Sequence, residues 1–192
     1  FLSKMRKELL KFTETIGKDN DLFKGDDVLS QGTVQARYQV ECNSFWRRVE
    51  VLDQIFPLIV AITGEIGNNS FDHNLGNWPD TPGIFFGYDI QKRNIVLADR
   101  GLGIFTTLKR VKPELKTDQE ALKVAFTEVI SGRAPESRGN GLKFVRKIVS
   151  ENPIGLVFRT GDAELILTKD SRELNIRSLS ESFRGCLASI TF

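Results

Sequence analysis

The chain has 192 residues, with 27 basic and 25 acidic side chains and a formal net charge of +2, which gives no electrostatic reason to expect nucleic acid as the main partner. Its hydrophobic content of 40% and charged content of 27% are typical of a soluble globular protein, and no apolar run approaches the roughly 18 residues of a membrane span. The length favours one domain with an extension over two domains.

The two cysteines favour a reducing compartment. Cys42 and Cys186 lie far apart and lack CxxC spacing, so we expect neither a zinc site nor a disulfide framework, and we expect a cytoplasmic location. The chain opens at Phe1 without a signal peptide and reaches its first methionine at Met5, which leaves open that it is a fragment of a longer protein.

The first third of the chain is predicted to hold a short helix, a loop, a strand and the start of a long helix. Apolar residues recur at helical spacing over 4–16, residues 19–27 are polar, and residues 34–42 alternate as in a half-buried strand. Asn43–Ser44 offers a helix N-cap before a long apolar stretch, which Pro57 is expected to kink or split in two.

Runs of strands, interrupted by helices, are predicted for the rest of the chain. Residues 84–90 and 94–98 read as a hairpin, and residues 117–130 read as a helix that Thr117 and Glu120 open as a capping box. A second helix is predicted over 141–149, and further strands at 156–159, 164–168, 173–178 and 186–192. Because the strands come in runs rather than in strict alternation with helices, we expect an α+β two-layer sandwich.

A carboxylate and a carboxamide lie one helical turn apart in the second half of the long apolar stretch. Glu65 and Asn69 share a helix face, while Ile59 and Ile62 belong to the apolar stripe beside them. A carboxylate can take a proton from water, and a carboxamide oxygen can ligate a hard cation such as magnesium. Taken alone, such a pair is more often part of a solvated surface than part of a site.

A first glycine-bearing segment follows the strand at 94–98. The carboxylate of Asp99 can accept a hydrogen bond from the exocyclic amine of adenine, whereas guanine presents a carbonyl at that position. Gly101 and Gly103 allow the backbone to turn and to approach a base closely, because no Cβ stands in the way. The alternative is an ordinary turn that closes a strand.

A second glycine-bearing segment opens the helix at 141–149. Gly139 and Gly141 flank Asn140 where free backbone N–H groups and the positive end of the helix dipole favour a phosphate. The alternative is a loop-to-helix junction that binds no ligand.

With these three motifs in this order, residues 45–192 resemble the GHKL group, which includes gyrase B, heat-shock chaperones, histidine kinases and mismatch-repair proteins. The nucleotide-binding unit of that group is the Bergerat fold. The resemblance implies a histidine kinase-like ATP-binding domain over 45–192 and an N-terminal extension over 1–44. It also implies a mixed, mostly antiparallel sheet covered by helices on one face. The motif spacing is most similar to that of anti-sigma-factor serine kinases and of the catalytic domain of histidine kinases.

The resemblance assigns roles to the motif residues. It implies that Glu65 is the catalytic base, that Asn69 holds magnesium, and that Asp99 reads adenine. It implies that residues 131–138 form the ATP lid, whose cations include Arg133 and Arg138. The other implied nucleotide contacts are Gly101, Gly103, Ile104, Arg138, Gly139, Asn140, Gly141 and Leu142.

Three positions depart from the family pattern. Asp72 replaces a cation that is common before the histidine matched by His73, which we expect to pack or cap locally rather than to act as a base. Lys143 stands where the family has a small residue, so it either reaches a phosphate or points away. Cys186 replaces the threonine of a Gly-Thr pair whose hydroxyl helps to hold the adenine aspartate through water, and a thiol is a weaker donor.

The resemblance implies a protein that binds ATP or ADP with magnesium and uses the γ-phosphoryl group, by hydrolysis or by phosphorylation of a protein partner. The chain lacks an H-E-x-R-T-P stretch, which argues against autokinase activity by these residues alone. The alternative is a regulatory binding module in which ATP only organises a surface for a protein partner. Homodimer formation stays open.

Overall fold

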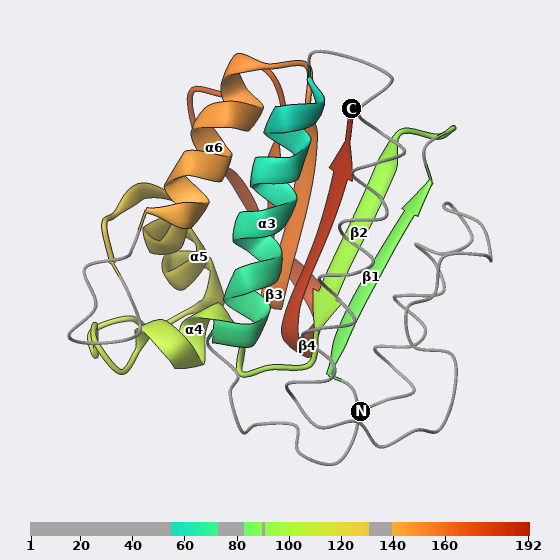
Figure 1. Ribbon diagram of the computed structural model, residues 1–192. Coiled ribbons are helices and arrows are strands. Elements are labelled where there is room, and N and C mark those ends of the chain that lie inside the picture. Colours follow the sequence, from blue (N-terminus) through green and yellow to red (C-terminus); the bar gives the residue numbers. More distant parts are fainter. Residues whose placement is uncertain (1–54, 73–82, 90, 131–139) are drawn as a thin grey trace.

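The computed structural model describes residues 55–72, 83–89, 91–130 and 140–192, which form one sheet and a set of helices (Figure 1). The strands are antiparallel to their neighbours in the order β1-β2-β4-β3. They are β1 (Ile84–Asp89), β2 (Asn94–Asp99), β3 (Gly155–Leu167) and β4 (Asn175–Thr191). The helices are α3 (Phe56–Asp72), α4 (Gly103–Leu108), α5 (Asp118–Thr127) and α6 (Gly141–Glu151). The described residues therefore have the predicted α+β architecture.

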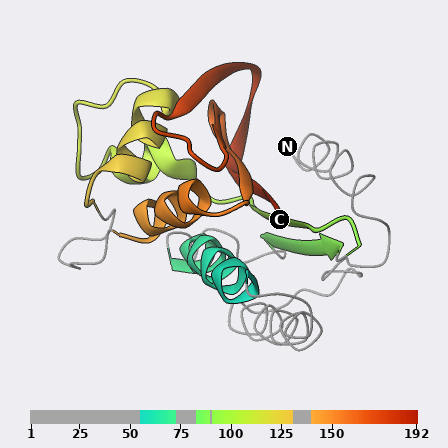
Figure 2. The same cartoon turned by 90° about the horizontal axis from the view of Figure 1, so that it is seen from above.

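Helices α3, α5 and α6 cover one face of the sheet (Figures 1 and 2). α3 packs beside α6 and over β2, and both α5 and α6 pack against β3. The core between the two layers is apolar. Its fully buried members include Ile59, Ile62, Leu122, Val145, Val149, Ile95, Leu156 and Leu165.

The apolar stripe predicted in the long helix is confirmed. Pro57 lies in the first turn of α3, where its missing N–H removes no helix hydrogen bond. Ile59, Ile62 and Ile66 recur every three or four residues and are at most 4% exposed, so this stripe attaches α3 to the core. The predicted stretch upstream of Ile55 lies outside the described residues.

The β1–β2 hairpin is also confirmed, and its second strand is buried on both faces. The register runs from Ile84 opposite Asp99 to Asp89 opposite Asn94. Alternate residues of β2 enter the main core, while Val96 and Ala98 join a smaller cluster with residues of β1 and β4. β2 thus delivers Asp99 to the end of a central strand.

The separate strands predicted at 156–159 and 164–168 are one strand, so that prediction is wrong in detail. A bulge replaces the expected break: the register of β3 against β4 shifts on both sides of Gly161, whose φ is +57°. The bulge is held from α5, because the carboxylate of Asp118 packs against Gly161 and accepts the N–H of Asp162 at 3.3 Å. The segments predicted at 173–178 and 186–192 are likewise joined in β4.

Helix α4 was not predicted, whereas the start of α5 was. The capping box is confirmed in part: the hydroxyl of Thr117 accepts the N–H of Glu120 at 3.1 Å. The carboxylate of Glu120 accepts the N–H of Lys116 at 2.7 Å, rather than that of the capping residue itself. α4 has six residues and begins at Gly103, so it is too short and too close to the glycine segment to give a helical pattern of its own.

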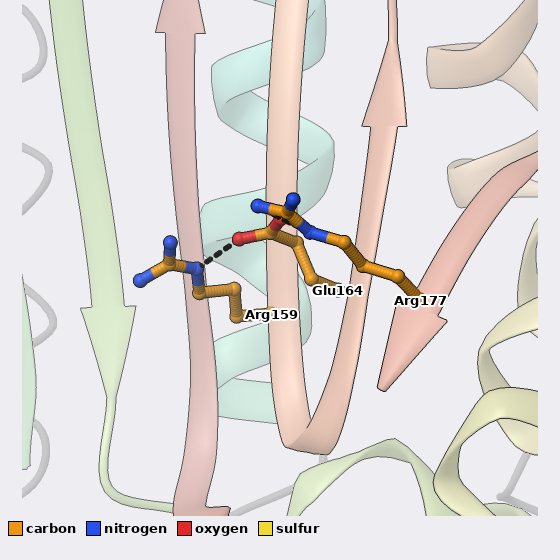
Figure 3. Close-up of polar contacts among 3 residues, drawn as sticks. All are labelled: Arg159, Glu164 and Arg177. Atoms are coloured by element: carbon orange, nitrogen blue, oxygen red, sulfur yellow. Dashed lines mark hydrogen bonds and ion pairs between the residues drawn. The ribbon is translucent and has the colours of Figure 1, made fainter. Parts of the chain in front are cut away.

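A charged cluster ties β3 to β4 on the face opposite α3 (Figure 3). The carboxylate of Glu164 is 1% exposed and accepts Nε of Arg159 through one oxygen and Nε of Arg177 through the other, both at 2.5 Å. Glu164 and Arg177 are also register partners. The cluster therefore reinforces the pairing of the two longest strands.

Several predictions lie outside the described residues: the helix at 4–16, the strand at 34–42, His73, and the segment 131–138. The boundary proposed between residues 44 and 45 lies there too. Among the helices of the described part of the chain, none combines the length and the hydropathy that crossing a membrane requires.

Candidate functional site

The carboxyl-terminal half of α3 presents polar side chains in two directions. Glu65 and Asn69 are half-buried at one edge of the helix, as their spacing predicted. Ser70 is 6% exposed and faces the sheet, where its hydroxyl donates to Oδ2 of Asp99 at 3.0 Å. The first and second motifs therefore meet through Ser70, which adjoins Asn69 in the chain.

Asp99 is a buried acceptor. Its side chain lies at the end of β2, is 3% exposed, and accepts hydrogen bonds from Ser70, from the N–H of Gly101 at 2.8 Å and from the N–H of Cys186. Burial opposes the negative charge more strongly than these three donors favour it, which raises the pKa of Asp99 from 3.8 to about 6. A buried carboxylate with neutral donors can recognise a further hydrogen-bond donor.

The segment from Asp99 to Ile104, which we call the Asp99 turn, is held by hydrogen bonds at both of its ends. The N–H of Arg100 donates to the carbonyl of Gly83 at 2.9 Å, and the N–H of Ile104 donates to the hydroxyl of Thr160 at 3.1 Å. Gly103 has a φ of +80°, a conformation that side chains other than glycine rarely adopt. The predicted need for glycine in this turn is therefore confirmed at Gly103.

The floor of the Asp99 turn is the bend of β4 at Gly185. Gly185 has a φ of +95°, and a Cβ there would overlap the backbone of Asp99 and Arg100. The next residue, Cys186, is the register partner of Asp99. β4 can approach the turn this closely only because residue 185 is glycine.

Cys186 lies where the resemblance placed a hydroxyl near the adenine-reading aspartate. Its thiol donates to the hydroxyl of Thr160 at 3.7 Å rather than to Asp99. Burial and, next, the charge of Asp99 raise the pKa of Cys186 well above 9.0, so the group is a neutral thiol. Cys186 approaches the aspartate through its backbone N–H instead.

The third motif meets the first at the start of α6. A Cβ on Gly141 would overlap the carboxylate of Glu65 and would lie 4.0 Å from Nδ2 of Asn69. Asn140 precedes the helix without capping it by its side chain, so it leaves the first N–H groups of α6 to other acceptors. The carboxylate of Glu65 thus lies beside the positive end of α6, where a negative charge is favoured.

Most of the predicted site residues are brought together around α3. Glu65, Asn69 and Gly141 form one end, and Asp99 with the turn forms the other. Gly101 is buried and Ile104 is half-buried within the turn. Leu142 packs against the core, Asn140 is exposed, and Lys143 is half-buried. Arg138 and Gly139 lie outside the described residues, so their predicted contacts stay predictions.

Three residues of the site were not predicted: Ser70, Thr160 and Arg184. Ser70 could have been found, because it continues the stripe of Ile59, Ile62 and Ile66 and a polar residue on a buried face needs a partner. Thr160 is fully buried in β3, and Arg184 reaches the carbonyl of Gly101, but neither carries a local sequence signal.

The residues fit the groups that the resemblance implies. Asp99 is a buried acceptor at one end. At the other end, the first turn of α6 can lie close to the carboxylate of Glu65 and the carboxamide of Asn69 because Gly141 has no Cβ. The described residues contain no cluster of three or more His, Cys, Asp or Glu side chains around a common point. Magnesium needs few protein ligands when phosphates and waters supply the rest.

Comparison with models of known protein families gives no match, and a search of curated proteins finds no relative.

Proposed function

We propose that the chain binds ATP with magnesium in a GHKL-type site of a Bergerat fold and uses the γ-phosphoryl group, for hydrolysis or for phosphorylation of a protein partner. One observation carries the proposal: two glycine-bearing segments that are far apart in the sequence converge on the last two turns of α3. Ser70 contacts Asp99, and Gly141 packs against Glu65 and Asn69. Accidental glycine turns have no reason to converge on one helix.

The adenine-binding end of the proposed site is Asp99. Its carboxylate is buried and is surrounded by donors, so a further donor such as the exocyclic amine of adenine fits the remaining acceptor capacity. Guanine would bring a carbonyl oxygen to the same place, which would oppose a carboxylate with a second acceptor. This end therefore supports a preference for adenine.

The phosphate end is the start of α6 with Asn69. The N–H groups of the first helical turn and the positive helix end favour an anion, and the carboxamide of Asn69 lies near Gly141. Bound magnesium would neutralise phosphate charge and orient the phosphates for phosphoryl transfer. On this proposal Asn69 supplies an oxygen ligand to the metal.

Glu65 is the proposed base. Its side chain is half-buried beside the first turn of α6, so it reaches the phosphate end without being removed from water. Its role is to accept a proton from water or from a substrate hydroxyl. Glu65 and Asn69 then perform different tasks from positions one helical turn apart.

Release of inorganic phosphate from ATP, with and without candidate protein partners, tests this function. Glu65→Gln keeps the shape of the side chain and should lower turnover roughly 10²–10⁴-fold, as is typical of a removed general base. Glu151→Gln, at the exposed end of α6, is the matched control and should leave the rate unchanged. Nucleotide binding without any turnover would favour the regulatory binding module. Equal rates for wild type and Glu65→Gln would overturn the assignment of Glu65 as the general base.

A further inference from the structure

The Asp99 turn has one carbonyl that is held by a side chain from β4. Nε of Arg184 donates to the carbonyl oxygen of Gly101 at 3.0 Å, although the two residues are 83 positions apart. The N–H of Gly101 donates to Oδ1 of Asp99 at 2.8 Å. Both polar groups of Gly101 therefore have partners, and its carbonyl direction is set by Arg184.

Arg184 is placed for this contact by its neighbour Gly185. The close approach of Gly185 to the backbone of Asp99 and Arg100 brings β4 against the turn. The residue itself is exposed, so its side chain adds little to the apolar core. Nε is an internal donor of a planar guanidinium, which fixes the direction of the hydrogen bond more tightly than a lysine ammonium would.

We infer that Arg184 is a positioning residue for the adenine-binding end of the nucleotide site, an inference that rests on the proposed function. By holding the carbonyl of Gly101, Arg184 keeps the N–H of Gly101 directed at Asp99 and keeps one face of that carboxylate available to adenine. Arg184 does not contact the phosphate end, which lies at Gly141 and Asn69. Its loss therefore weakens recognition of the base and spares the metal-dependent part of binding.

Arg184→Gln tests this inference, with Arg172→Gln as the matched control. Arg172 is an exposed arginine of the β3–β4 connection that accepts a hydrogen bond from Arg146 through its backbone carbonyl, which the substitution retains. The measurements are calorimetric titration with ADP, with and without magnesium, the melting temperature, and deuterium exchange of peptides covering 100–105 without nucleotide.

We expect Arg184→Gln to weaken ADP binding roughly tenfold, equally with and without magnesium, because one hydrogen bond that holds the turn is lost. Exchange across 100–105 should rise several-fold while the melting temperature stays close to that of wild type. Arg172→Gln should match wild type in every measurement. Arg184→Lys should recover only part of the affinity, because it has no donor at the position of Nε.

Unchanged ADP affinity and unchanged exchange in Arg184→Gln would overturn the inference. A loss confined to magnesium-containing samples would overturn it too, because it would place Arg184 at the phosphate end. If wild type binds no ADP, the proposed function fails. The exchange comparison then still decides whether Arg184 holds the turn.

Discussion

The hydroxyl of Ser70 donates to Oδ2 of Asp99 across 3.0 Å, and this hydrogen bond joins the last turn of α3 to the end of β2. Both groups are buried, so the bond is costly to leave unmade. The residue before Ser70 is Asn69, whose carboxamide lies near the start of α6. The proposed adenine-binding end and the proposed phosphate end are therefore linked to adjacent residues of one helix.

The raised pKa of Asp99 predicts a specific dependence of stability on pH. Its folded value of about 6 exceeds 3.8, so between these values the folded chain keeps a proton that the unfolded chain has lost. The contribution of Asp99 to the free energy of unfolding should therefore fall as pH rises from about 4 to about 6, by about 3 kcal/mol, and stay level above that.

Urea unfolding of wild type and of Asp99→Asn across this pH range measures the effect. The asparagine should fold, because the hydroxyl of Ser70 can turn and accept from the new amide. Since the variant has no charge to bury, its stability relative to wild type should increase with pH by about the same 3 kcal/mol. A difference in the free energy of unfolding between the two proteins that does not change with pH would contradict the raised pKa of Asp99.

Asn69→Ala and Glu65→Gln should fail in different ways. Asn69→Ala should weaken nucleotide binding chiefly when magnesium is present, because the ion loses its protein ligand while the contacts at Asp99 stay intact. Glu65→Gln should bind ATP about as tightly as wild type and lose turnover. Calorimetry with and without magnesium, together with a phosphate-release assay, separates the two. Equal weakening by Asn69→Ala in both conditions would argue against a metal ligand.

Gly141→Ala places a methyl group against the carboxylate of Glu65, and Gly64→Ala provides a matched helix substitution. The added Cβ at Gly141 overlaps the flexible end of Glu65, so the fold should survive while the carboxylate moves and turnover falls at least roughly tenfold. A Cβ at Gly64 meets nothing within 4 Å and should raise the free energy of unfolding by about 0.5–1 kcal/mol without loss of activity. Full activity in Gly141→Ala would show that the position of Glu65 does not matter.

Glu164→Ala should destabilise the fold without any effect specific to nucleotide. Removing this carboxylate, which is 1% exposed, leaves Arg159 and Arg177 close together without their shared partner. Because both arginines are partly exposed, water relieves some of the penalty, and we expect a loss of about 2–3 kcal/mol in urea unfolding. Glu173→Ala, in the exposed β3–β4 connection, should change stability by less than about 0.5 kcal/mol. A comparable small change in Glu164→Ala would mean that the cluster is not stabilising.

Features governed by local pattern were predicted from the sequence. The stripe that includes Ile59 and Ile62, the β1–β2 hairpin and the cap of α5 by Thr117 each depend on local sequence patterns. The same holds for the candidate site at Glu65 and Asn69, whose shared helix face follows from their spacing alone.

Features governed by distant contacts were not predicted. The bulge of β3 is held by Asp118, which is 44 positions from its partner Asp162. From the local sequence alone, Gly161 therefore predicts a break between two strands. The contact of Arg184 with Gly101 spans 83 positions, and no local sequence pattern in either segment predicts it. Tertiary contacts of this kind override the local preference for a turn.

The most direct test of the proposed site is calorimetric titration of the chain with ATP and, separately, with GTP, both with magnesium. Asp99 can accept from the amine of adenine and has no donor for the carbonyl of guanine, so ATP should bind and GTP should bind at least roughly tenfold more weakly. At ATP a hundredfold above its dissociation constant, the fold should gain about 2.7 kcal/mol. Equal affinity for ATP and GTP, or no binding of either, would contradict the proposal.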